Sequence, residues 1–173
     1  MAESDLLFTI AEVAVAFAGF ASLVAILGRR SSKDDPRVLG ARMRAMILFS
    51  LLAVAFSLMP PVLYRYGLDE SATWRVASAL FALVFAGVGA WFVSATSRLL
   101  RLDVPRPKNA PLIGAVVLST IAAGVLVLVL NAFAIAPSVM AARYLTVLGL
   151  LLFLAGFAFS LIVFSFLPAL DSE

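Results

Sequence analysis

The chain contains no cysteine and no histidine among its 173 residues. The first absence excludes disulfides, thiolate nucleophiles and thiolate-bound metals, and the second excludes imidazole bases, the commonest zinc ligands and histidine-ligated haem. Walker, GxSxG and HExxH motifs are also lacking, as is a pair of intramembrane aspartates. We therefore expect no metal, no cofactor and no enzymatic activity.

Charge is the next scarce property. Only 13% of the residues are charged and 64% are hydrophobic, whereas about a quarter of a soluble domain is charged. The net charge of +3 is small, and its basic residues gather in two short loops, so no basic stripe is available for nucleic acid. No stretch resembles a linker, and we expect one domain over residues 1–173.

Long apolar runs are what the sequence has in abundance. A hydrocarbon core about 30 Å thick requires about 20 apolar residues in a helix, and irregular backbone cannot face lipid. The sequence therefore predicts an all-α, polytopic membrane helix bundle with five transmembrane helices. They span about residues 4–28, 36–64, 73–100, 111–133 and 137–167.

Capping and helix-breaking residues refine these boundaries. Asp69, Glu70 and Ser71 offer oxygens that cap the third helix. Pro60-Pro61 is expected to kink or end the second helix. Only a few residues separate the fourth and fifth helices, which predicts a tight hairpin that opens the fifth helix at Pro137.

The lysines and arginines predict the orientation, because cytoplasmic loops carry an excess of them. Ten of them lie in or beside the first and third loops: Arg29, Arg30, Lys33, Arg37, Arg42, Arg44, Arg98, Arg101, Arg106 and Lys108. The three on the other side are Arg65, Arg75 and Arg143. We expect the N-terminus outside and the C-terminus in the cytoplasm, in a cytoplasmic (inner or plasma) membrane. Anionic lipid headgroups are the expected partners of the cytoplasmic loops.

Aromatic residues agree with this orientation, since Tyr and Trp favour membrane interfaces. Tyr64, Tyr66, Trp74 and Tyr144 fall at the predicted outer boundary. Trp91 lies deep in the third helix, where we expect it to pack between helices and to hydrogen-bond through its indole.

Glu12 is the candidate functional residue, because an acid inside an apolar helix costs about 2.5–3.5 kcal/mol at the centre of a membrane. In one interpretation, copies of Glu12 form a cation-attracting ring near the outer mouth of an oligomeric pore. The possible pore-facing residues below it are Ala16, Gly19, Leu23 and Ile26. Arg30 follows on the same face, and a basic residue there argues against simple cation conduction.

The other interpretation pairs Glu12 with Arg143. Both residues are expected about 10 Å below the outer surface by helix rise, and isolated intramembrane charges commonly pair. A salt bridge between the first and fifth helices would neutralise Glu12 without any transport. The sequence leaves both interpretations open.

Small residues at four-residue spacing let helices approach closely. The packing positions predicted in the first and third helices are Ala14, Ala18, Ser22, Ala82, Ala86, Ala90 and Ser94, and the fourth helix has Ala115, Ser119 and Ala123. Asn131 is expected to cap a helix end. Hydroxyls such as Ser50, Ser57, Thr120 and Thr146 are expected to return hydrogen bonds to their own helices.

Two functions follow from this pattern. The first is a homo-oligomeric ion channel or pore, with the first helix and Glu12 toward the axis. The alternative is a non-catalytic accessory or scaffold subunit that packs within a larger membrane complex.

Overall fold

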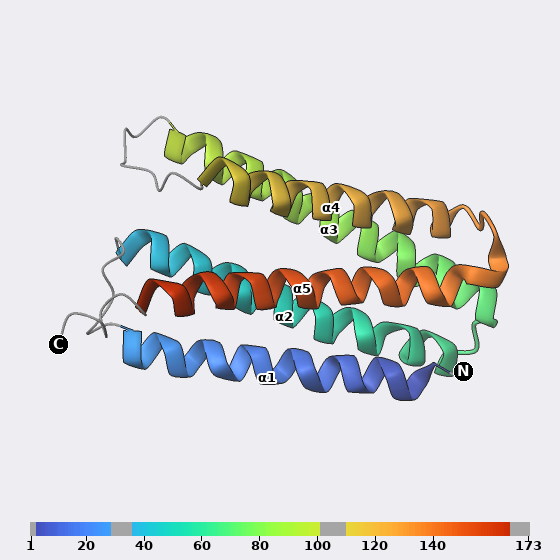
Figure 1. Cartoon of the computed structure of the whole chain (residues 1–173). Coiled ribbons are helices and arrows are strands. Elements are labelled where there is room, and N and C mark those ends of the chain that lie inside the picture. Colours follow the sequence, from blue (N-terminus) through green and yellow to red (C-terminus); the bar gives the residue numbers. More distant parts are fainter. Residues whose placement is uncertain (1–2, 29–35, 101–109, 167–173) are drawn as a thin grey trace. The chain divides into compact units, whose positions relative to one another are not determined.

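The computed structural model describes residues 3–28, 36–100 and 110–166, and all five predicted helices are present there (Figure 1). They are α1 (Ser4–Gly28), α2 (Pro36–Arg65), α3 (Glu70–Leu100), α4 (Ala110–Ala132) and α5 (Met140–Phe166), with a short 3-10 turn, η1 (Pro137–Val139), before α5. Each of the five α-helices contains a stretch long and apolar enough to cross a membrane. The all-helical prediction is confirmed, and the described residues contain no strand.

The third helix begins earlier than predicted. α3 starts at Glu70 rather than Thr73, because Asp69 satisfies its first turn: Asp69 Oδ1 accepts a hydrogen bond from the Ala72 amide at 3.2 Å. The predicted cap is therefore confirmed. The fifth helix begins later than predicted, since Pro137 opens the 3-10 turn and α5 starts at Met140.

The second helix does not end at its two prolines. α2 continues through Pro60 and Pro61 to Arg65, and tight bonds close it, from the Tyr66 amide to Leu63 O and from the Gly67 amide to Tyr64 O. Gly67 has a φ of 89°, a conformation that glycine adopts readily. Each proline lacks a backbone N–H, so the helix loses two hydrogen-bond donors there. The hydrogen bonds of Tyr66 and Gly67 close the helix after the prolines.

The chain divides into two compact units. One comprises Met1–Val62 with Leu148–Glu173, and the other comprises Leu63–Val147. α2 and α5 contribute residues to both. The prediction of one domain over residues 1–173 remains a prediction.

In the first unit, one side of α1 is buried. The buried residues among the described side chains of α1 are Leu7, Ala11, Ala14 and Ala21. Their spacings of four, three and seven residues place them on one side of the helix, as in a helix-packing seam. Ala21 belongs to a core cluster with Leu39, Met46, Ala158 and Ile162. The Phe17 and Phe159 rings meet edge to face at 6.4 Å. Arg42 donates a hydrogen bond to Leu161 O at 3.2 Å, which joins α2 to α5.

In the second unit, α3 and α4 run antiparallel and pack against each other (Figure 1). Two glycines permit the close approach. A Cβ atom at Gly89 would lie 3.0 Å from Ile121 Cγ2, and one at Gly124 would lie 2.7 Å from Phe85 Cε1. At each glycine, a side chain of the facing helix occupies the space that a Cβ atom would need.

An aromatic cluster fills the core of this unit. The Tyr144 ring lies 5.4 Å from Trp74 and 5.6 Å from Phe81, and Phe81 lies 5.7 Å from Phe85. Trp74 and Tyr144 are buried, so they pack against neighbouring helices instead of projecting outward as interface anchors do. Trp91 shows the opposite deviation, since it was expected to pack between helices and is 53% exposed.

Substitution of Gly124 by alanine should destabilise the protein by about 1–3 kcal/mol, the usual effect of overpacking a core. The added methyl would overlap the Phe85 ring, which is fully buried and cannot easily move. Gly114→Ala is the matched control, because a Cβ atom there meets nothing within 4 Å. Unfolding midpoints in mild detergent would measure both, and equal midpoints would contradict the packing.

Candidate functional site

The hairpin between α4 and α5 holds the densest group of polar interactions in the second unit. α4 ends with two overlapping backbone bonds, from the Ala134 amide to Asn131 O at 2.9 Å and from the Ile135 amide to Leu130 O at 3.1 Å. This is the Schellman arrangement of a helix end. Ala134 adopts a φ of 55° and Ala136 a φ of 56°, a conformation that costs a residue other than glycine about 1–2 kcal/mol. The predicted tight hairpin is confirmed.

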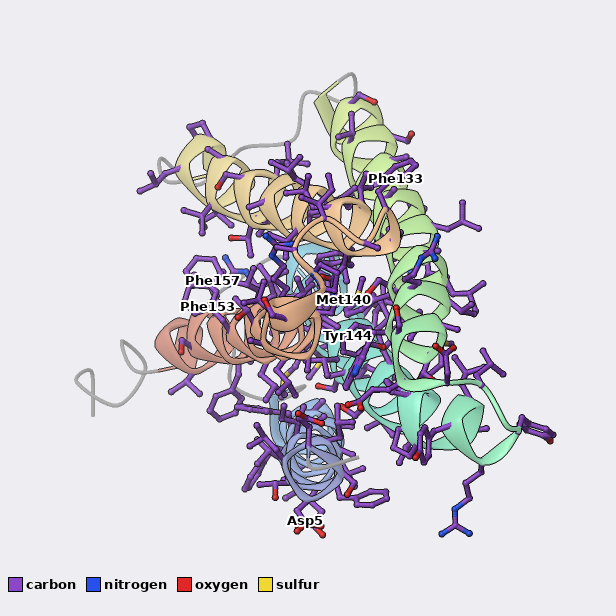
Figure 2. The ribbon with its side chains drawn as sticks, turned by 90° about the vertical axis from the view of Figure 1, so that its right-hand side faces the viewer. Asp5, Phe133, Met140, Tyr144, Phe153 and Phe157 are labelled. Atoms are coloured by element: carbon purple, nitrogen blue, oxygen red, sulfur yellow. The ribbon has the colours of Figure 1, made fainter. Side chains whose placement is uncertain are left out.

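Asn131 joins the three helices of this unit. Its side-chain amide nitrogen donates to Met140 O at 2.8 Å and to Ser78 Oγ at 3.2 Å. The residue is fully buried, where hydrogen bonds are strong because no water competes with them. Figure 2 looks toward this end of the unit and labels Met140 and Tyr144 at the start of α5. The predicted role as a helix-end cap is wrong, because the side chain reaches across to α3 and α5.

Two arginines complete the hairpin. The Arg75 side chain donates from Nε to Ala132 O at 3.2 Å, and the Arg143 guanidinium donates to Ile135 O. Both acceptors are carbonyls at or just beyond the C-terminal end of α4, where a cation is favoured by the helix dipole. Among the described side chains of the second unit, Thr73 Oγ1 and Asn131 Oδ1 are buried without a hydrogen-bond partner.

The α1 residues predicted to face a pore lie opposite the buried seam. Glu12, Ala16 and Gly19 are exposed in the single chain, and Leu23 is 55% exposed. The side chains of Ile26 and Ser22, and all of Arg30, lie outside the described residues. The four described positions therefore share an open face.

The pairing of Glu12 with Arg143 stays a prediction. Glu12 belongs to the first unit and Arg143 to the second. The Arg143 guanidinium donates to the hairpin carbonyl of Ile135, within the second unit.

The predicted packing stripes divide into buried and exposed parts. Ala14 and Ala82 are buried and Ala18 is half-buried, whereas Ala86, Ala90 and Ser94 are exposed. On α4, the small residues Ala115, Ser119 and Ala123 are exposed as well. On α3, only the first residue of the stripe therefore packs within the chain, and on α1 the two residues whose side chains are described are buried or half-buried.

Open hollows follow the α3–α4 pair. The larger one, about 470 Å³, is lined only by uncharged residues: Ala86, Gly89, Ala90, Val93, Leu118, Ile121, Ala122, Val125, Leu126 and Val129. A smaller one of about 280 Å³ is lined by Ala72, Arg75, Val76, Ala79 and Ala132. The sequence interpretation missed both, since it used Arg75 for orientation only. The sequence feature that could have indicated the hollows is Arg75 followed by the small residues Ala79, Ala86 and Ala90 on the same face of the third helix.

The prediction that hydroxyls bond within their own helices is confirmed for Thr120 and Thr146 and wrong for Ser50 and Ser57. Thr120, Thr146 and Ser160 each donate to the carbonyl one turn back, at 2.8 to 2.9 Å. Ser50 and Ser57 differ, because both are fully buried and their Oγ atoms have no partner. No group of three or more acidic, cysteine or histidine side chains that could hold a metal occurs in the described part.

Comparison with protein-family models, with curated proteins and with solved structures finds no match for this chain.

Asn131→Leu should destabilise the protein by about 1–3 kcal/mol, because the Met140 carbonyl and the Ser78 hydroxyl lose their buried donor. Ser119→Ala is the control, since that exposed hydroxyl bonds only within its own helix, to Val116 O, and its loss should change stability by less than about 0.5 kcal/mol. Chemical unfolding in mild detergent compares the two. A leucine variant as stable as the control would show that the bridge contributes nothing.

Proposed function

We propose that the chain is an integral protein of the cytoplasmic membrane that assembles with copies of itself into an ion channel or pore. In this assembly α1 faces the symmetry axis, with Glu12 near the outer mouth. The observation that supports it is the division of α1 into two sides: Leu7 and Ala14 are buried, while Glu12 and Leu23 are exposed. A helix on a symmetry axis requires one side held by its own subunit and one side free.

The free side has a chemistry suited to conduction. A ring of Glu12 carboxylates concentrates cations and replaces part of their hydration shell. Ala16 and Gly19 leave width behind the ring, and Leu23 supplies an apolar constriction of the kind that gates by dewetting. Repeating Glu12 around the axis beside water also removes the need for an intrachain partner, because the carboxylates then face a hydrated lumen.

The orientation in the proposal places the N-terminus outside. It rests on the excess of basic residues around the first and third loops. The hydrogen bond between Arg75 and Ala132 O brings the start of α3 beside the end of α4 in either orientation. Both ends then belong to the same membrane surface.

A topology reporter tests this orientation. A reporter placed after Arg30 or after Pro105 should be cytoplasmic, and one placed after Leu68 should be external. An enzyme active only in the cytoplasm, paired with one active only outside, gives opposite readouts at each site. The reverse pattern at all three sites would overturn the orientation.

The channel itself is tested by Glu12→Gln. Particle mass in mild detergent should first show a closed homo-oligomer, and the reconstituted protein should carry ion currents. Loss of the carboxylate should reduce the preference for cations over anions, measured as a shift in reversal potential, while the oligomer mass stays the same. Glu70→Gln is the matched control, since Glu70 is also exposed but lies on α3.

Two other outcomes would contradict the proposal. If Glu12→Gln lowers stability and Arg143→Gln restores it in the double variant, the two residues form a salt bridge. If the particle is a monomer bound to foreign proteins, the chain is an accessory or scaffold subunit. The exposed small residues Ala115, Ser119 and Ala123 of α4 favour this second function, because small residues suit close contact with another helix.

A further inference from the structure

The two hollows of the second unit lie along one side of the α3–α4 pair. On α3 the smaller hollow is lined by Ala72, Val76 and Ala79 and the larger one by Ala86, Ala90 and Val93, all at helical spacing. Residues three or four apart occupy the same face of a helix. We call this line of hollows the α3–α4 furrow.

The furrow has one charged residue, and it lies at one end. Among the lining residues, Arg75 alone carries a charge. Its Nε–H donates to Ala132 O, which holds the guanidinium at the end of α4, and a guanidinium has further N–H groups to donate. Asp69 and Glu70 are nearby in sequence, and no ion pair joins either of them to Arg75 among the described residues.

The distance from Arg75 to Ala86 matches the length of one lipid molecule in a leaflet, and Val93 lies beyond it. Ala86 lies about 16 Å along α3 from Arg75, and Val93 about 27 Å, at a rise of about 1.5 Å per residue. One leaflet contributes about 15 Å of hydrocarbon, and the headgroup region adds several more. A charged group held at Arg75 would therefore place an attached acyl chain in the apolar part of the furrow.

We propose that the α3–α4 furrow binds a phospholipid, with its phosphate at Arg75 and one acyl chain along Ala86, Ala90 and Ala122. The arginine donates charge-assisted hydrogen bonds to the phosphate, for which its planar group is well suited. The small side chains leave the space that the acyl chain fills. The furrow is cationic at one end, at Arg75, and uncharged along the rest. An amphiphile with one anionic group complements this pattern, whereas a uniformly apolar helix of a second copy does not. This site is independent of the channel, since it uses neither α1 nor Glu12.

The headgroup contact is tested by native mass spectrometry of the full-length, delipidated protein titrated with dioleoyl phosphatidylglycerol. The wild-type protein should bind one lipid more tightly than any others, and Arg75→Gln should weaken that first site about fivefold, the effect of removing one basic residue near an anionic headgroup. Arg65→Gln is the matched control, because Arg65 is exposed but lines neither hollow. Equal weakening by the two substitutions would overturn the assigned phosphate contact.

The acyl contact is tested by a pair of neighbouring alanines on α4. Ala122 and Ala123 are both exposed, but only Ala122 lines the furrow. Ala122→Leu should fill the space and weaken the first lipid site at least fivefold, whereas Ala123→Leu should leave it unchanged. This pair also keeps the proposal testable if the Arg75 variant fails to fold.

Two results would assign the furrow differently. If inorganic phosphate or soluble glycerophosphoglycerol competes as well as the intact lipid does, the acyl chain contributes nothing and Arg75 is a free-phosphate site. If Ala122→Leu changes the mass of the oligomer without changing lipid binding, the furrow is an interface with another helix. Either result would overturn the proposal.

Discussion

The carbonyl groups at the end of α4 have no partner in their own helix, and the arrangement of the second unit follows from how they are satisfied. Two backbone bonds close the turn, and Arg75 and Arg143 donate to the carbonyls of Ala132 and Ile135. A backbone carbonyl that is withdrawn from water and has no hydrogen-bond partner costs free energy. The same requirement brings the start of α3 and the start of α5 to the hairpin.

Once the hairpin is closed, Asn131 and the glycines determine the packing behind it. Asn131 links α4 to Ser78 and Met140, and Gly124 admits the Phe85 ring at a distance that no Cβ atom allows. Between these contacts, the small residues of α3 leave an open furrow on the outside of the pair. Tight packing in the core, at the glycines, and free space at the surface, beside the alanines, thus both arise from small residues.

The proposed roles fall on different helices. The first concerns the free side of α1, where Glu12 is the one acid in the exposed face below the first turns. The second concerns the α3–α4 furrow, where Arg75 is the single charge. Only 13% of the residues are charged. An isolated charge among apolar neighbours is not screened by them, so it strongly influences which ions or headgroups bind to the surface around it.

The sequence by itself determined the number, type and approximate limits of the helices, because helix length and hydrophobicity are local properties that hydrocarbon thickness constrains. It also identified the cap at Asp69 and the tight hairpin before Pro137, which depend on neighbouring residues. Only the tertiary structure decided that Trp74 and Tyr144 are buried together, that Trp91 is exposed, and that Asn131 and Arg75 reach other helices. Those facts depend on how each helix is rotated toward its neighbours. The hydrophobic pattern leaves that rotation undetermined when nearly every face of a helix is apolar.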